Sequence, residues 1–569
     1  MVSFKNLYSL RSVSTEEKEK SNRSNDDTNS LDSSSTERDQ TKLTNVNTTH
    51  RTLTARNLHL IALGGSIGTG LFVTISSGLV NGGPLSLFLA FFIWTGVIFS
   101  ITSSIGEMVC YLPISSPFIE MAGRCVDEAF EAVVGFNYFI MISVFIPFEI
   151  TAVNGMIHFW RDDYNPAIAF CVQIVIYTFL NTMAVRWFGE SEFYLTIGKV
   201  LLAIGLIIFT FIVMVGGNPQ HDAFGFRYWK NPGPLVAIIT TGSMGRFHGF
   251  MAALNKACFT IVGPEYLSMV AGEAGQETRK ILAGTFRTVF YRLIVFYVLG
   301  ALSVGILVAS NDPTLVELFS SGSTSNGSFS PYIIAMNNMR IKVLPHIVNV
   351  LCVLSAFSAG NSYVYCSSRA LYGLALRGFV PKFFTYCTNQ GVPIFCVGVS
   401  FLFTLLSLLQ LGNGTAVVLD WIVNLLSGAE VLNYFFMTIT FFCFHRAVNA
   451  QGIDRSEFRY RSWFQPYTVI FGGIMTLCMV GALGYTVFMP GQWNVQNFLT
   501  YYLMVLIAIP LFIGYKLIYR TKFVKPEEAD LVTGLEEIEI HEMEYLEKLE
   551  QERHTTESTR WEKITDWIF

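Results

Sequence analysis

GGSIGTG, the stretch from Gly64 to Gly70, lies in the first long apolar segment of the chain. Four glycines in seven residues weaken a helix, because each one costs about 1 kcal/mol relative to alanine. Close helix packing through small residues is the alternative interpretation. The density of glycines favours an interrupted helix, whose free N–H groups and positive dipole end suit an anionic group such as a carboxylate.

The sixth apolar segment contains a second interruption. It reads FTIVGPE from Phe259 to Glu265, so that a glycine, Pro264 and an acid come together in mid-segment. Proline has no N–H for the helix and clashes with the preceding turn. In hydrocarbon, freed backbone groups are tolerated only where they are buried in protein or line a cavity. Unwound carbonyls here would accept from an ammonium group, so the two interrupted helices together predict a transporter site for a zwitterion.

The composition is that of a polytopic membrane protein. Of the 569 residues, 51% are hydrophobic and 14% are charged, whereas a soluble domain is typically about 25% charged. Apolar runs of about 17–25 residues, enough to span a bilayer, recur from Leu58 almost to Tyr519. No soluble block remains for a catalytic domain, no basic patch offers a nucleic-acid site, and no cysteine spacing suggests a metal. We therefore expect no enzyme, no cofactor and no nucleic-acid partner.

An all-α fold with twelve transmembrane helices is predicted for residues 57–519. The expected spans are 58–80, 86–110, 129–158, 166–184, 191–215, 247–271, 285–309, 345–372, 393–411, 417–442, 467–489 and 496–518. Residues 1–56 form a polar tail that cannot bury enough apolar surface to fold alone, so we expect it to be disordered. Residues 520–569 form an acidic tail, either packed on the inner face as an amphipathic helix or solvated.

Charge in the loops predicts the orientation. Loops and flanks on the side of the two termini carry sixteen Lys and Arg residues, and the opposite loops carry six. The positive-inside rule therefore places both tails in the cytoplasm. Lys5, Lys18 and Lys20 of the N-terminal tail are candidate targets of trafficking and ubiquitination machinery, and plain solubility is the alternative explanation.

Ionisable side chains inside apolar spans are costly and therefore mark functional candidates. Glu149 in the third span is one. Lys199 in the fifth span has two interpretations: an ammonium that exchanges a proton, or a permanent cation in the place of a sodium ion. Glu107 lies at the inner end of its span, where capping or pairing explains it. The roles of Lys256 and Glu430 are open.

Several stretches together resemble the fungal amino-acid permease family, within the amino acid–polyamine–organocation superfamily. They are Gly64–Phe72, Gly82–Pro84, Gly106–Met108, Phe188–Glu190, the surroundings of Lys199, Gly225–Trp229, Ser358–Ser362 and Ser367–Ala375. A narrower set resembles one divergent member, a yeast plasma-membrane regulator of carnitine and polyamine uptake. This set includes Glu107–Cys110, Ile146–Glu149, Trp160–Tyr164, Gly217–Pro219 and Glu265–Met269.

The resemblance implies a five-plus-five inverted repeat with helices 1 and 6 broken, two extra C-terminal helices, and proton-coupled uptake. It also implies roles for individual residues. Substrate contacts would fall at Ser66, Gly68, Thr69, Gly70, Glu149, Phe259, Val262, Gly263 and Glu265, and proton coupling at Lys199. Thr69 and Gly70 would hold the carboxylate, and the backbone of Ser66 would face the ammonium. Phe259 would be an aromatic gate over the site.

The primary hypothesis is therefore a plasma-membrane, proton-coupled transporter of amino acids and related amino-bearing solutes. A buried carboxylate favours a positive partner, so Glu149 and Glu265 place carnitine and polyamines ahead of common amino acids. The departure of Val73–Ser77 from the family pattern and the acidic C-terminal tail motivate the alternative, a nutrient sensor that signals through its tails. The expected partners are the solute, protons and membrane lipids.

Overall fold

The structure is a computed structural model that describes residues 67–114, 116–161, 163–183, 185–271, 278–320, 330–388, 391–536, 538–540, 542–543 and 547. The chain divides into two units, residues 1–48 with 387–391 and residues 49–386 with 392–569. The helices below belong to the second unit, and throughout the described ranges the regular structure is helical. The polar tail predicted for residues 1–56 lies outside the described residues.

The helices have the following bounds. They are η1 (Gly70–Thr74), α4 (Ile75–Tyr111), α5 (Pro117–Cys125), α6 (Glu128–Ile157), α7 (Pro166–Met183), α8 (Val185–Met214), α9 (Arg227–Lys230), α10 (Gly242–Thr260), α11 (Pro264–Val270), α12 (Thr278–Arg292), η3 (Leu293–Val298), α13 (Leu299–Leu307), α14 (Pro313–Ser320), α15 (Pro331–Asn338), α16 (Leu344–Leu376), η4 (Lys382–Thr385), α17 (Ile394–Thr404), η5 (Leu405–Leu411), α18 (Thr415–Ala450), η6 (Arg455–Glu457), α19 (Tyr467–Ala482), η7 (Tyr485–Phe488) and α20 (Val495–Tyr519).

Each predicted membrane span coincides with a helix in the described part of the chain. Eight helical segments are long and apolar enough to cross a bilayer, and two shorter apolar helices, Pro166–Thr182 and Tyr467–Ala482, lie where spans were expected. The segment Gly70–Tyr111 contains two predicted spans, and α10 with α11 supplies the sixth, which is interrupted as predicted. The all-α, multi-pass architecture is therefore confirmed.

The division of Gly70–Tyr111 into two passes depends on Gly83. Its φ of 81° lies in the left-handed region, which glycine adopts without a Cβ penalty, and Pro84 follows it. Backbone from the loop before α10 supplies the missing partners: Leu85 N–H donates to the Pro234 carbonyl at 2.9 Å, and Val236 N–H donates to the Gly82 carbonyl at 3.0 Å. The bend therefore leaves these groups hydrogen-bonded, as a buried backbone requires.

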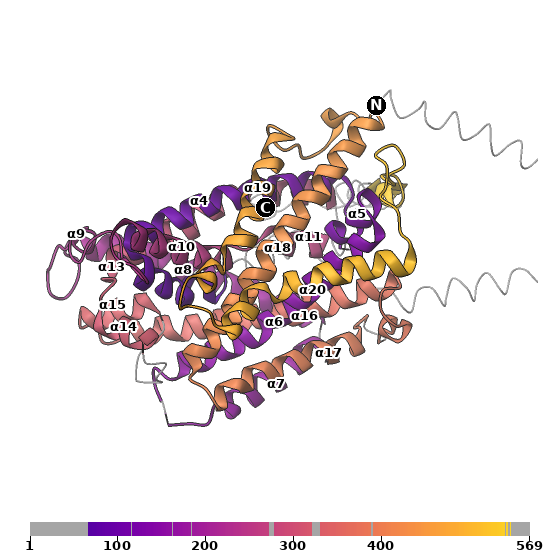
Figure 1. Cartoon of the computed structure of the whole chain (residues 1–569). Coiled ribbons are helices and arrows are strands. Elements are labelled where there is room, and N and C mark those ends of the chain that lie inside the picture. The colour runs from indigo at the N-terminus through magenta and orange to yellow at the C-terminus, as the bar shows by residue number, and fades with distance from the viewer. Residues whose placement is uncertain are drawn as a thin grey trace, which may run out of the picture. The chain divides into compact units, whose positions relative to one another are not determined.

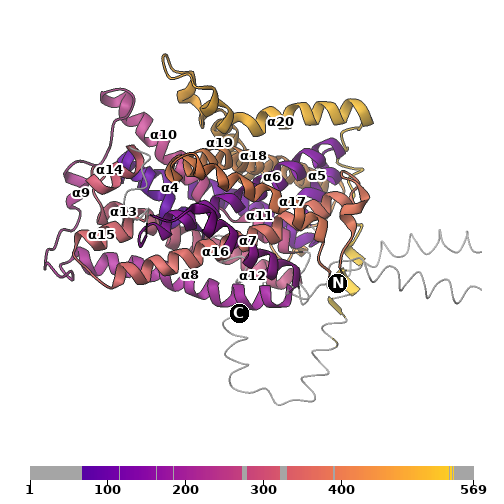
Figure 2. The same ribbon diagram turned by 90° about the horizontal axis from the view of Figure 1, so that it is seen from below.

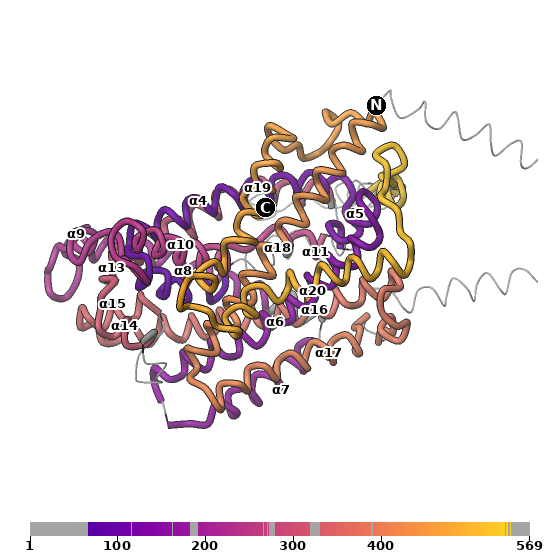
Figure 3. Tube along the Cα trace, viewed as in Figure 1, coloured from indigo at the N-terminus to yellow at the C-terminus, as the bar shows by residue number. Residues whose placement is uncertain are grey.

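Two long helix pairs position the site. α10 packs along α4, and α16 packs along α6 (Figure 1). α18 connects the two pairs by packing on α4, α6 and α10. α19 and α20 pack on α18 (Figure 2), and α7 lies beside α17 (Figure 3). The core of the unit is thus formed by α4, α6, α10, α16 and α18, the helices that carry most of the predicted site residues.

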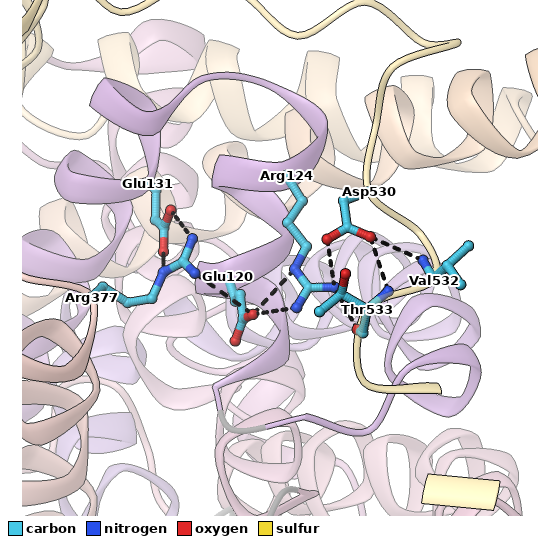
Figure 4. Close-up of polar contacts among 7 residues, drawn as sticks. All are labelled: Glu120, Arg124, Glu131, Arg377, Asp530, Val532 and Thr533. Atoms are coloured by element: carbon cyan, nitrogen blue, oxygen red, sulfur yellow. Dashed lines mark hydrogen bonds and ion pairs between the residues drawn. The ribbon is translucent and has the colours of Figure 1, made fainter. Parts of the chain in front are cut away.

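A chain of ion pairs ties α5, α6 and the end of α16 to the segment after α20 (Figure 4). Arg377 donates to both carboxylate oxygens of Glu131, at 2.6 and 2.8 Å, and its Nη1 lies 3.8 Å from Glu120. Arg124 donates to Glu120 at 2.5 Å and to the carbonyl of Thr533 at 2.8 Å. The predicted acidic tail is therefore in contact with the helices where the structure describes it.

Candidate functional site

The predicted interruption in the sixth span is present. α10 ends at Thr260, residues 261–263 are not helical, and α11 begins at Pro264. Pro264 occupies the first turn of α11, where its missing N–H costs nothing because the first N–H groups of a helix have no intrahelical partner. Val262 and Gly263 are half-buried in the unwound stretch. The Val262 carbonyl lies outside both helices, and the Gly263 carbonyl accepts from the Leu267 N–H of α11 at 3.4 Å.

The structure describes the first predicted span from Ile67 onward. Ile67 and Gly68 form a bend, and helix begins at Thr69 and continues as the π-helical turn η1. π-Turns are rare and are often found at functional sites. Gly64, Gly65 and the predicted site residue Ser66 lie outside the described residues.

The start of η1 lies against the end of α10. A Cβ on Gly70 would be 3.2 Å from both Cα and Cγ2 of Thr260, the last residue of α10. This approach is tighter than side chains ordinarily make, so the glycine lets η1 reach the end of α10. The sequence predicts interruptions in spans 1 and 6, and the folded chain brings the described part of the first, from Ile67, close to the second.

Glu149 lies at the N-terminal end of η1. Thr69 Oγ1 donates a hydrogen bond to Glu149 Oε2, and a Cβ on Gly68 would be 3.5 Å from Glu149 Oε1. Both Thr69 and Glu149 are 1% exposed. The structure thus joins three predicted site residues, Gly68, Thr69 and Glu149. It also shows that the Thr69 hydroxyl is occupied by a carboxylate of the protein.

Phe259 packs into an aromatic cluster on α6. Its ring centroid is 4.9 Å from that of Phe148, at an interplanar angle of 74°, and 5.7 Å from that of Phe145. The Phe145 ring in turn stacks on Tyr363 of α16 at 4.7 Å. Phe259 is 2% exposed. The predicted gate residue therefore lies directly before the interruption and close to the turn of α6 that carries Glu149.

Glu265 and Glu430 form a second acidic region at the sixth-span interruption. Glu265 is 3% exposed and accepts from the Gly263 N–H through Oε1 at 3.2 Å. Glu430, on α18, is fully buried and accepts from the Tyr434 hydroxyl at 2.9 Å. The same hydroxyl lies 3.4 Å from the carbonyl of Ile261, the first unwound residue. The role of Glu430 was open from sequence, and the fold places it at the site.

Lys199 has an acidic partner that was not among the residues predicted from sequence. Its Nζ lies 3.4 Å from Glu192 Oε1 in the same helix, and Ser358 Oγ of α16 donates to Glu192 Oε2 at 2.7 Å. Lys199 is 2% exposed and Glu192 is 1% exposed. The sequence signal that could have revealed Glu192 is its spacing: it lies seven residues before Lys199, which puts the acid and the base on one face of an apolar helix.

Lys256 and Glu107 are engaged in ion pairs away from the interruptions. Lys256 Nζ lies 2.7 Å from Asp420 of α18. Glu107 accepts from Arg455 through both oxygens, at 2.7 and 2.9 Å, and from the Ser462 N–H at 2.9 Å. Pairing at the end of its helix, the interpretation that explains Glu107 from sequence, is therefore what the structure shows.

The comparisons with known proteins agree with a transporter. Residues 57–527 match the family described as amino acid permease. The general amino acid permease AGP2 of Saccharomyces cerevisiae is 46% identical over 504 residues, 87% of this chain and 84% of that protein. The proline-specific permease of the same yeast is 38% identical over 86% of this chain and 79% of its own length. Its dicarboxylic amino acid permease is 35% identical over 91% and 86%.

Among solved structures, a manganese transporter of Eremococcus coleocola, in complex with an aromatic bis-isothiourea substituted compound, is 12% identical. Its TM-score is 0.48, with 86% of this chain and 94% of that chain covered. The sequence relatives decide the family, because they are permeases that match most of this chain at 35–46% identity. Together with the match over residues 57–527, they lead to one conclusion: this multi-pass membrane protein belongs to the amino acid permease family.

Proposed function

We propose that the protein is a plasma-membrane, proton-coupled transporter of amino-bearing solutes that favours carnitine- or polyamine-type cations over common amino acids. The observation that carries the proposal is the contact between Gly70, at the start of η1, and Thr260, at the end of α10, with Glu149 beside the first and Glu265 near the second. Family membership supports transport of an amino-acid-like solute. The two buried acids support the preference for cations, because a buried carboxylate is stabilised by a positive partner.

In this proposal the two ends of the solute meet different backbone groups. Where the solute has a carboxylate, as carnitine and amino acids do, that group binds at the N-terminal end of η1, at Gly68, Thr69 and Gly70, where N–H groups and the helix dipole favour negative charge. The backbone of Ser66 faces the ammonium. The unwound carbonyls of Val262 and Gly263 face the cationic end of the solute: they accept from a primary ammonium and attract the quaternary ammonium of carnitine through their dipoles alone, and Glu265 offsets the charge of either. Phe259 closes over the bound cation, which aromatic rings attract.

Proton coupling follows from two of the buried ionisable groups. Lys199 is the proposed coupling residue, and Glu192 is the acid with which it forms an ion pair. Glu149 occupies the same helix end as the proposed substrate carboxylate. Two negative charges at that end repel each other, so protonation of Glu149 favours binding of the substrate carboxylate. Proton coupling at Lys199 and protonation of Glu149 should both make uptake increase when the external pH falls.

Uptake in permease-deficient yeast cells tests the proposal. Labelled carnitine, spermidine and a panel of amino acids are offered at several external pH values, with an uncoupler as a control. We expect uptake of a cationic solute that rises on acidification and collapses with the uncoupler. Glu265→Gln and Lys199→Ala should abolish this uptake when it is corrected for the amount of protein at the surface. No uptake of any solute by correctly localised protein would refute the proposal.

The sensor alternative makes a different prediction for the C-terminal tail. A sensor deleted after Tyr519 should lose its downstream transcriptional output, whereas a carrier should keep its flux. The described part of the tail contacts the helices, for example through the Arg124 bond to Thr533, which gives a signal a physical route between the two. We propose transport as the primary function because the site lies at the interrupted helices rather than at the tail.

A further inference from the structure

Two buried carboxylates lie at the sixth-span interruption without a cation from the protein. Among the described residues no Lys or Arg pairs with Glu265 or Glu430. The two buried lysines of neighbouring helices form ion pairs with other acids: Lys256 pairs with Asp420, and Lys199 pairs with Glu192. The charged group that acts on Glu430 is Glu265 itself. Like charges in a buried setting repel each other, so this arrangement calls for positive charge from outside the chain.

Three acceptor groups in this region are unused. Within the part of the chain that the structure describes, no donor reaches Oε2 of Glu265 or Oε2 of Glu430, and neither amide atom of Asn433 has a partner. Asn433 is fully buried. Asn433 lies three residues after Glu430 and Tyr434 lies four residues after it, so both lie near the face of α18 that carries Glu430. Buried polar groups without hydrogen-bond partners are uncommon in folded proteins, so these atoms indicate a site for a group from outside the chain.

The region is connected to the proposed substrate site. The Tyr434 hydroxyl lies between Glu430 Oε1, 2.9 Å away, and the unwound carbonyl of Ile261, 3.4 Å away. Tyr363, which stacks on the aromatic cluster of Phe259, interacts electrostatically with Glu149, Glu265 and Glu430. The Tyr363 ring, which stacks on Phe145, is thus within electrostatic range of all three carboxylates, and Glu430 extends the site beyond the two acids predicted from sequence.

The geometry points to a subsite for a primary ammonium group, formed by Glu265, Glu430 and Asn433, which receives the second amine of a diamine or polyamine. An ammonium carries three N–H donors, and the region offers three unused acceptors: one oxygen of each carboxylate and the amide oxygen of Asn433. A quaternary ammonium has no N–H and leaves all three unpaired. The inference rests on the proposed function and deepens it, because it ranks polyamines above carnitine.

Replacement of Glu430 by Gln tests the subsite. The variant keeps the size of the side chain and removes the charge, and uptake of labelled putrescine, carnitine and proline is compared after correction for surface expression. We expect the half-saturating concentration of putrescine to rise about 10-fold or more, because a charge-assisted hydrogen bond to the ammonium is lost. The half-saturating concentrations of carnitine and proline should rise by a clearly smaller factor, because neither solute has a second primary ammonium. Glu457→Gln, the same change at an exposed position, is the matched control and should shift none of the three.

The outcomes separate the subsite from the proposed function. Absence of uptake of every solute by wild-type protein at the surface refutes transport. Uptake by wild type with an equal shift for all three solutes in Glu430→Gln, or with no shift for putrescine, overturns the subsite alone. If Glu430→Gln fails to reach the surface, Asn433→Leu keeps both carboxylates and should weaken putrescine selectively. Unchanged putrescine affinity in Asn433→Leu also overturns the subsite.

Discussion

Gly70 shows how a single residue determines the geometry of the site. Its missing side chain lets η1 approach the end of α10, and any Cβ would meet the backbone of Thr260 at 3.2 Å. Backbone cannot move away as a flexible side chain can, so a larger residue must separate the two interruptions. The same chain contains glycines without such a constraint: Gly96 in α4 has open space around the position of a Cβ.

Gly70→Ala should therefore abolish or strongly reduce uptake while the protein still reaches the surface. Overpacking of this kind costs about 1–3 kcal/mol. That loss should leave the fold intact but move η1 away from the end of α10. Gly96→Ala should leave uptake unchanged, since alanine is the better helix former by about 1 kcal/mol. Labelled-solute uptake corrected for surface expression measures both. Equal activity of the two variants would show that the approach of η1 to α10 is not required.

Thr69 makes a second prediction at this scale. Its hydroxyl is the donor to Glu149, and both side chains are buried, so Thr69→Val leaves a carboxylate oxygen without its donor. Loss of a hydrogen bond to a buried charged group costs about 1.5–3 kcal/mol. We expect a lower melting temperature of the purified protein for Thr69→Val and near wild-type melting for Thr69→Ser. Identical melting of the Val and Ser variants would contradict the assigned contact.

At the scale of elements, the buried Lys199–Glu192 pair joins α8 to α16. Both residues lie in α8, and Ser358 of α16 donates to Glu192 at 2.7 Å. α8 and α16 also pack directly on each other. Removing one charge of a buried pair leaves the other uncompensated, whereas replacing both by apolar groups is often tolerated.

Lys199→Met should therefore destabilise the protein by about 3–5 kcal/mol, and the double variant Lys199→Met with Glu192→Leu should recover most of that loss. Thermal unfolding in detergent measures the stability of both. The double variant should nevertheless lack proton-dependent uptake, because neither ionisable group remains. Recovery of proton-dependent uptake in it would contradict the coupling role and leave the pair purely structural.

At the scale of the whole molecule, the segment after α20 contacts helices that are far apart in sequence. Tyr111 at the end of α4 donates to the Leu531 carbonyl at 3.2 Å, and Gln451 after α18 donates to the Ala529 carbonyl at 2.7 Å. Leu531 is fully buried. The described residues from 535 to 543 are helical, and Arg279 lies 3.6 Å from Glu542. Of the two interpretations of the acidic tail, contact with the protein is the one these residues support.

Leu531→Asp should release this segment, because burial of a leucine contributes about 1.5–3 kcal/mol and a buried aspartate has no partner there. Val532→Asp is the matched control, since Val532 is 63% exposed. Limited trypsin digestion at the exposed Lys525 should be faster in the Leu531 variant than in wild type or in the control. The same cleavage rate in all three would show that the segment is not held by Leu531.

Much of the fold and part of the site could be predicted from the sequence, because they depend on local chemistry. Apolar runs of bilayer length determine the membrane spans. Pro264 with Gly263 separates α10 from α11 through local backbone chemistry, whatever the surroundings of these helices. The spans 58–80 and 86–110 predicted a connection at residues 81–85, where Gly83 lies. Its positive φ was not predicted, because it is stabilised by backbone of the loop around Pro234, which the local sequence does not contain.

The pairing of charges was decided by the tertiary structure. Glu107 meets Arg455 across 348 residues, and Glu430 reaches the unwound Ile261 through Tyr434. The sequence determined that these acids lie in or beside apolar spans and that two spans are interrupted. Which acids are neutralised and which remain open to a substrate depends on how each helix is rotated toward its neighbours. That rotation is set by side-chain packing between segments distant in the chain, such as Gly70 against Thr260.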